Sequence, residues 1–71
     1  MTNVAQLFRY IDHLRIAEAM EVDLLVQIMD LPPRNRIACL PILARLHAEV
    51  EALRLATTRA LAAQIVQVGP E

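Results

Sequence analysis

The 71-residue sequence contains no lysine, no tryptophan, one glycine, one cysteine and only two aromatic side chains. A single cysteine cannot form a disulfide within the chain, and no cluster of metal-ligating residues accompanies it. A domain this small buries only about 60% of the surface that its unfolded chain exposes, so it usually needs a disulfide, a metal or a partner subunit. A partner subunit is the remaining option, and we expect no metal and no cofactor.

Long apolar runs and strand signals are also missing. Arg9 and Asp12 interrupt the first apolar stretch, and no run approaches the roughly 18 apolar residues of a membrane-spanning helix. We therefore expect a cytoplasmic protein that makes no membrane contact. Alternating β-branched residues between turn-forming residues, which would predict strands, do not occur.

Apolar spacing predicts a first helix over about residues 4–30. From Val4 onward, apolar side chains recur three or four residues apart, and the preceding Thr-Asn pair offers an N-cap. This helix should end near Asp30, because each proline at 32–33 disfavours helical backbone in the residue before it. Pro33 can then open the next helix, where its missing N–H costs nothing.

Pro41 complicates the start of the second helix. Inside a helix it removes the hydrogen bond to the carbonyl of Ile37 and clashes with that carbonyl. Residues 31–41 therefore form a proline-rich joint, in which residues 33–40 are either a short separate helix or the first turns of a kinked one. A long helix should follow over about 42–68.

The long helix carries an apolar seam that repeats close to every seven residues. Its members are Leu43, Leu46, Val50, Leu53, Thr57, Ala60 and Gln64. Beyond Leu53 the seam weakens, while Leu61, Ile65 and Val68 continue an apolar line on a rotated face. This second line indicates a small shift of register near the end of the helix.

The predicted fold class is all-α, a single domain of residues 1–71 folded as an antiparallel helical hairpin with a proline-rich joint. Residues 1–30 carry a net charge of −3 and residues 31–71 a net charge of +2, so the two arms attract each other. No basic stripe is present, and we expect no direct binding to nucleic acid. All seven basic residues are arginine, which is typical of a GC-rich bacterial or phage genome.

The first helix is apolar over too wide an arc for one neighbour. Its apolar residues sweep roughly 200°, whereas a helix that packs on one side shows a stripe of about 100°. A second copy of the chain is the simplest source of the missing cover. We therefore predict a homodimer in which two hairpins form a four-helix bundle.

Glu18 and Glu21 fall inside this apolar arc, where an unpaired carboxylate would be costly. In a hairpin that reverses near residues 31–35, residues whose numbers sum to about 65 or 66 face one another. The resulting pairs are Glu18 with His47, Arg15 with Glu51, and Asp12 with Arg54.

We interpret Arg15, Glu18, His47, Glu51 and Arg54 as a structural polar network that fixes the register of the hairpin. A metal or acid–base role is the alternative. Bundle metal sites usually repeat Glu-x-x-His pairs, and neither histidine has that spacing.

The outer face of the first helix carries an acidic ridge. Asp12, Asp23 and Asp30 lie within about 20° of one another at 100° per residue, and Ile16 and Met20 lie beside them. Such a ridge with apolar neighbours can bind a basic protein surface, although an ordinary solvated face is the alternative. The candidate partner-binding residues are Asp12, Ile16, Met20 and Asp23, with Arg34 and Arg36 at the joint as further exposed candidates.

No catalytic motif is present. Cys39 lies near two arginines, but no histidine is close to it in sequence, so we interpret it as a small apolar residue under the joint rather than a reactive thiol. Residues 11–30 loosely resemble the first helix of small dimeric chorismate mutases. Those enzymes use lysine as well as arginine to hold two carboxylates, and this chain has no lysine. We expect no enzymatic activity.

The chain has two predicted helices, an acidic outer ridge, a tendency to dimerise, arginine as its sole basic residue type apart from histidine, and no enzyme motif. In these features it resembles the small anti-activator proteins, some phage-encoded, that bind LuxR-type quorum-sensing regulators. The likeness is one of build over the whole chain, and no motif carries residue roles across. It implies a small inhibitor that masks the basic surface of a bacterial transcriptional regulator. The alternatives are a helical chaperone or assembly subunit, an antitoxin, and a small helical enzyme.

Overall fold

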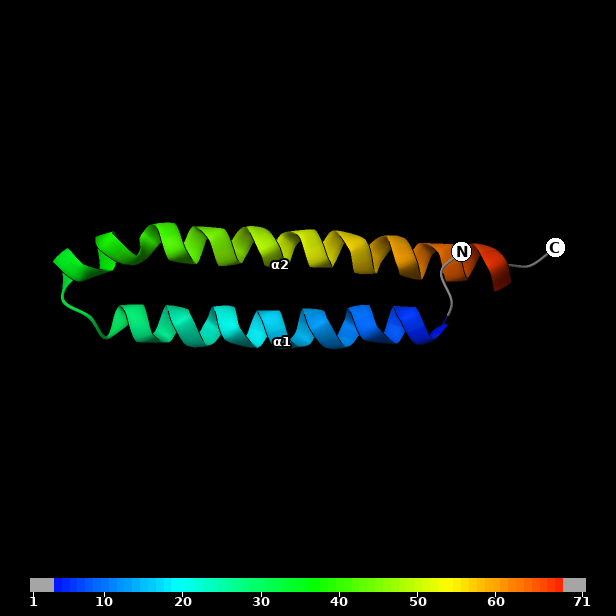
Figure 1. The fold of residues 1–71 in the computed structure, drawn as a ribbon, viewed down its shortest axis with the longest axis horizontal. Coiled ribbons are helices and arrows are strands. Elements are labelled where there is room, and N and C mark those ends of the chain that lie inside the picture. The colour runs from blue at the N-terminus through cyan, green and yellow to red at the C-terminus, as the bar shows by residue number, and fades with distance from the viewer. Residues whose placement is uncertain (1–3, 69–71) are drawn as a thin grey trace.

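A computed structural model describes residues 4–68 of the chain. Two helices, α1 (Val4–Met29) and α2 (Pro33–Val68), lie side by side and run antiparallel (Figure 1). No strand occurs in the part of the chain that the structure describes. The rod they form extends over 58 × 17 × 15 Å. The prediction of an all-helical hairpin is confirmed.

The joint between the helices is only three residues long, from Asp30 to Pro32. The last turn of α1 closes with the Leu31 amide donating to the Ile28 carbonyl at 3.0 Å. The Pro32 carbonyl then accepts the amides of Asn35 and Arg36 at 2.9 and 3.1 Å. Pro32 thus occupies the N-cap position and Pro33 is the first helical residue, where a proline lacks nothing that the helix needs.

The side chain of Arg36 closes the C-terminal end of α1. Its Nε donates to the Leu31 carbonyl at 2.8 Å, and its Nη2 donates to the Met29 carbonyl at 2.9 Å. The last carbonyls of a helix have no donor within the helix, so they need partners of this kind. Arg36 therefore ties the first turn of α2 to the end of α1.

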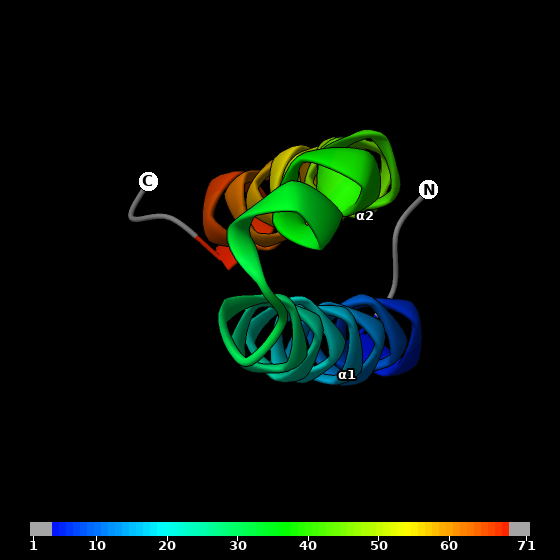
Figure 2. The same cartoon turned by 90° about the vertical axis from the view of Figure 1, so that its left-hand side faces the viewer.

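Pro41 lies inside α2, and no separate short helix forms. Of the two alternatives for residues 33–40, the structure has the first turns of one continuous helix. These turns lie out of line with the rest of α2 (Figure 1), and in the end-on view the first turn is displaced toward α1 (Figure 2). The missing N–H of Pro41 removes one rung of the helix there and permits this departure.

The core is a thin seam between the helices. Among the residues whose exposure is described, only Leu7, Ile28, Val50 and Ala60 are buried, and Val50 is fully inaccessible. The predicted seam of α2 is the inward line, because each of its seven members is buried or half-buried.

The predicted shift of register near the end of α2 is wrong. Ala60 remains buried while Leu61 and Ile65 are 48% and 58% exposed. The seven-residue repeat therefore continues with small and polar side chains, and the apolar line of Leu61 and Ile65 points away from α1. Val68 is the third residue of that line, and its side chain lies outside the described residues.

Candidate functional site

Two interhelical hydrogen bonds join α1 to α2 near the middle of the hairpin. His47 Nδ1 lies 2.6 Å from Glu21 Oε2, and Arg54 Nη2 donates to Glu18 Oε2 at 2.8 Å. Glu51 lies between the two α2 residues: its Oε1 accepts Arg54 Nη1 at 2.7 Å and lies 3.7 Å from His47 Nε2. We call Glu18, Glu21, His47, Glu51 and Arg54 the polar cluster.

The predicted register is wrong. Glu18 pairs with Arg54 rather than with His47, and His47 pairs with Glu21, so the observed residue numbers sum to 72 and 68. The partner of His47 thus lies three residues further along α1 than predicted. The physical reason lies at the joint. The first turn of α2 is displaced toward α1 (Figure 2) and belongs to the reversal of the chain. The reversal is therefore centred beyond residue 33, and the numbers of facing residues have a larger sum than predicted.

The other two predicted pairs do not form either. Glu51 pairs with Arg54 and His47 of its own helix. Arg15 is exposed and makes no ion pair with any residue between 4 and 68, so it does not belong to the polar cluster. Asp12 is also exposed, and the long side chain of Arg54 extends to Glu18 instead.

The polar cluster is held at the surface rather than in the core. Its side chains range from 22% exposed at Glu21 to 57% at His47. The hydrogen bond that Arg54 donates to Glu18 raises the pKa of Arg54, and the charge of Glu51 adds to this effect. The groups are mutually paired and none is a free nucleophile, so the arrangement suits a network that fixes helix register. Between residues 4 and 68 no group of three or more histidine, cysteine or carboxylate side chains could hold a metal ion.

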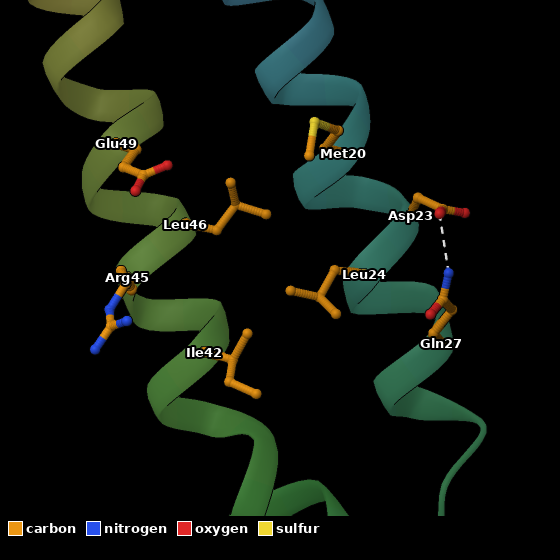
Figure 3. Close-up of a pocket in the computed structure, with 8 residues that line it drawn as sticks. All are labelled: Met20, Asp23, Leu24, Gln27, Ile42, Arg45, Leu46 and Glu49. Carbon is orange, nitrogen blue, oxygen red and sulfur yellow. Dashed lines mark hydrogen bonds between the residues drawn. The ribbon is translucent and has the colours of Figure 1, made fainter.

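A groove of about 420 Å³ opens between the helices on another side of the hairpin. Its floor is apolar and is formed by Met20, Leu24, Ile42 and Leu46. Its charged or polar rims are Asp23 and Gln27 on α1 and Arg45 and Glu49 on α2. Figure 3 shows Leu24 and Leu46 pointing toward each other across the floor, while Arg45 lies at the outer edge.

The polar groups of this groove do not bridge the helices. The one hydrogen bond between groove residues runs along α1, where Gln27 Nε2 donates to Asp23 Oδ2 at 2.9 Å. The floor residue Met20 is 56% exposed and Ile42 is 60% exposed. The groove therefore presents apolar surface between charged edges, which is the usual composition of a site that binds another protein.

The four partner-binding candidates predicted on the first helix occupy two hollows. Met20 and Asp23 line the groove. Asp12 and Ile16 line a shallower hollow of about 440 Å³ along α1, beside Arg15 and Ala19. All four are exposed. The sequence did not reveal the α2 side of the groove, because finding the residues opposite Met20 requires the helix register.

The two arginines predicted as exposed candidates at the joint differ. Arg34 is exposed. Arg36 is half-buried, and its guanidinium is occupied by the carbonyls of Met29 and Leu31. Arg36 is therefore a structural residue and not a free contact for a partner. Cys39 is also half-buried, in keeping with a packed small residue near the joint.

Comparisons of this chain with protein-family models, with curated proteins and with solved structures find no match. Neither α1 nor α2, within the described residues, has a stretch long and apolar enough to cross a membrane.

Proposed function

We propose that this protein is a small non-enzymatic regulator that binds another protein through the groove and the outer face of α1. The observation that carries the proposal is the groove itself, which has an apolar floor between charged rims. Exposed apolar side chains gain free energy when a partner covers them. Fixed charges around such a floor select the partner by sign.

The partner proposed is the basic surface of a bacterial transcriptional regulator. Two exposed acids of α1 lie at the hollows, Asp12 in the shallower one and Asp23 at the rim of the groove, where Glu49 of α2 adds a third carboxylate. A surface of this kind attracts a DNA-contacting face and competes with DNA for it. The resemblance in build to anti-activators makes a LuxR-type quorum-sensing regulator the first partner to test.

We also propose that the protein acts as a homodimer in which two hairpins form a four-helix bundle. The support is the thin core: four buried side chains are few for a chain with 56% hydrophobic residues. Fifteen large apolar side chains remain exposed among the described residues, which a second copy would partly cover.

Affinity capture from a bacterial lysate tests the binding function. The baits are the wild-type chain, a variant with Met20→Asp and Asp23→Arg, and Leu55→Asp as a control. Leu55 is 52% exposed, close to the 56% of Met20, and does not line the groove. We expect a DNA-binding activator to bind the wild type and the control but not the groove variant.

The captured activator should also lose its DNA in a mobility-shift assay when the wild-type chain is added. Capture of a secreted or structural subunit instead would favour a chaperone or assembly role. Equal capture of the activator by all three baits would show that the groove is not the binding site.

A further inference from the structure

We propose that a second copy of this chain docks on the side of the hairpin that carries the polar cluster, with the two-fold axis parallel to the helices. In this arrangement α1 of each copy lies on α2 of the other. The inference rests on the homodimer proposed above and specifies its surface and its axis. We call this side the dimer face.

The seven-residue spacing of a paired helix identifies what lies on the dimer face with the polar cluster. On α1, Leu25 is seven residues from Glu18, and Val22 is four residues from it, so both share its side of the helix. On α2, Leu40 is seven residues before His47, and Ile37 is fourteen before Glu51. Together with Met29, which is seven residues beyond Val22, they form an apolar patch near the joint.

The same spacing places a second apolar patch at the other end. Val4 is fourteen residues before Glu18, and Phe8 is fourteen before Val22. Leu61 is seven residues after Arg54, and Ile65 is fourteen after Glu51. These four side chains are 48% to 59% exposed. The dimer face is therefore apolar at both ends and charged in the middle.

This side carries most of the unburied apolar surface. Nine of the fifteen exposed large apolar side chains among the described residues belong to its two patches. The groove has two, namely Met20 and Ile42. Covering the dimer face would therefore remove more apolar surface from water than covering the groove side would.

A second copy fits this face in size. The extents of 58 by 17 Å bound this face at about 1,000 Å², and a stable interface buries about 800 Å² on each partner. The chemical composition of the face also suits a second copy. When two identical faces meet, apolar patches contact apolar patches, and a centre with both signs of charge contacts another such centre. A self-complementary surface is what a two-fold interface needs.

Charge selects the axis. Within the polar cluster, α1 contributes two carboxylates, Glu18 and Glu21, whereas α2 contributes Arg54 and His47 against one carboxylate, Glu51. A two-fold axis across the helices would lay α1 on α1 and α2 on α2, which opposes like charges. An axis along the helices lays α1 on the partner's α2 and opposes unlike charges. All neighbouring helices are antiparallel in both cases, so the helix dipoles do not distinguish them.

Distance measurement between two spin labels tests the axis. The label is attached at Arg34→Cys in a Cys39→Ser background, which places one label at the joint end of each protomer. The proposed axis brings both joints to the same end of the bundle, so we expect a separation of about 20–30 Å, given helices packed 8–10 Å apart. A separation near the 58 Å length of the hairpin would overturn the axis.

Sedimentation equilibrium of matched variants tests the face. Val22→Glu and Ile37→Glu each place a charge in the apolar patch near the joint, and we expect each to raise the dimer dissociation constant about tenfold or more. The control Ile16→Glu alters a side chain that is 59% exposed, close to the 61% of Val22, but Ile16 lines the hollow beside Asp12 and belongs to neither apolar patch. It should change the constant less than about twofold.

The outcomes separate this inference from the proposal on which it rests. A wild-type chain that sediments as a folded monomer would overturn both. A dimer that Ile16→Glu weakens and Val22→Glu does not would leave the homodimer standing and overturn the dimer face.

Discussion

Polar side chains make different hydrogen bonds on the two sides of the hairpin. On the dimer face, Glu18 and Glu21 reach across to Arg54 and His47 and join the helices. On the groove side, the hydrogen bond of Asp23 stays within α1, and its partner Gln27 is one turn away. Side chains that bridge the helices hold the hairpin in register, whereas a hydrogen bond within one helix places no constraint on the register.

The largest expected effect is on partner binding. Reversing Asp12 and Asp23 to arginine should weaken binding of a basic partner about 100-fold, because each change replaces attraction with repulsion at the contact. Isothermal titration of the captured partner measures the affinity, and circular dichroism checks the fold. Ile16→Asp probes the apolar part of the same surface. If all these variants bind at full strength, the outer face of α1 is not the interface, and exposed Arg34 becomes the next candidate.

The next effect concerns stability on the side with the bridging charges. His47→Glu would place a third carboxylate beside Glu21 and Glu51, so we expect the free energy of unfolding to fall by about 1 kcal/mol. Urea unfolding measures the loss. Adding Glu21→Arg should recover much of it, because an arginine–glutamate ion pair then joins the helices at the same two positions.

Arg45→Glu provides the matched control on the groove side, where Arg45 makes no ion pair with any described residue and the new carboxylate lies one turn from Glu49. It should cost no more than about 0.5 kcal/mol. Equal losses from His47→Glu and Arg45→Glu would remove the distinction between the two sides.

A similar loss is expected at the joint, which belongs to neither side. Arg36→Ala leaves the carbonyls of Met29 and Leu31 without their donor, and it should lower the free energy of unfolding by roughly 1 kcal/mol. Arg34→Ala, two residues away and exposed, should stay within about 0.5 kcal/mol of the wild type. The same denaturant titrations compare the two. Identical stabilities would mean that the cap contributes nothing.

The smallest effect is expected from the groove rim. Gln27→Ala removes the hydrogen bond to Asp23, which joins exposed residues four apart, and should cost only about 0.2–0.5 kcal/mol. It should also leave self-association unchanged, because Gln27 lines the groove. A larger loss of stability would show that the groove side holds the hairpin together as the polar cluster does.

The outward character of four candidate residues was predictable, since Asp12, Ile16, Met20 and Asp23 all lie outside the apolar stripe at 100° per residue. That Met20 and Asp23 line a groove was not predictable. The other wall comes from Ile42, Leu46 and their neighbours on α2, and their position opposite α1 depends on the register. The prediction that Arg36 is an exposed partner contact is wrong for a related reason. Its partners are the backbone carbonyls of Met29 and Leu31, and the pattern of side chains in a sequence does not show where backbone acceptors lie.

The sequence by itself determined the two helices, their antiparallel packing and the inward line of α2. Apolar spacing and proline positions act within a few residues, so they specify local structure directly. Tertiary structure alone decided that Glu21 meets His47, that Glu18 meets Arg54 and that a groove opens at Met20. Those pairings depend on how the first turn of α2, displaced ahead of Pro41, crosses toward α1, and a shift of one turn there changes every facing residue along the hairpin.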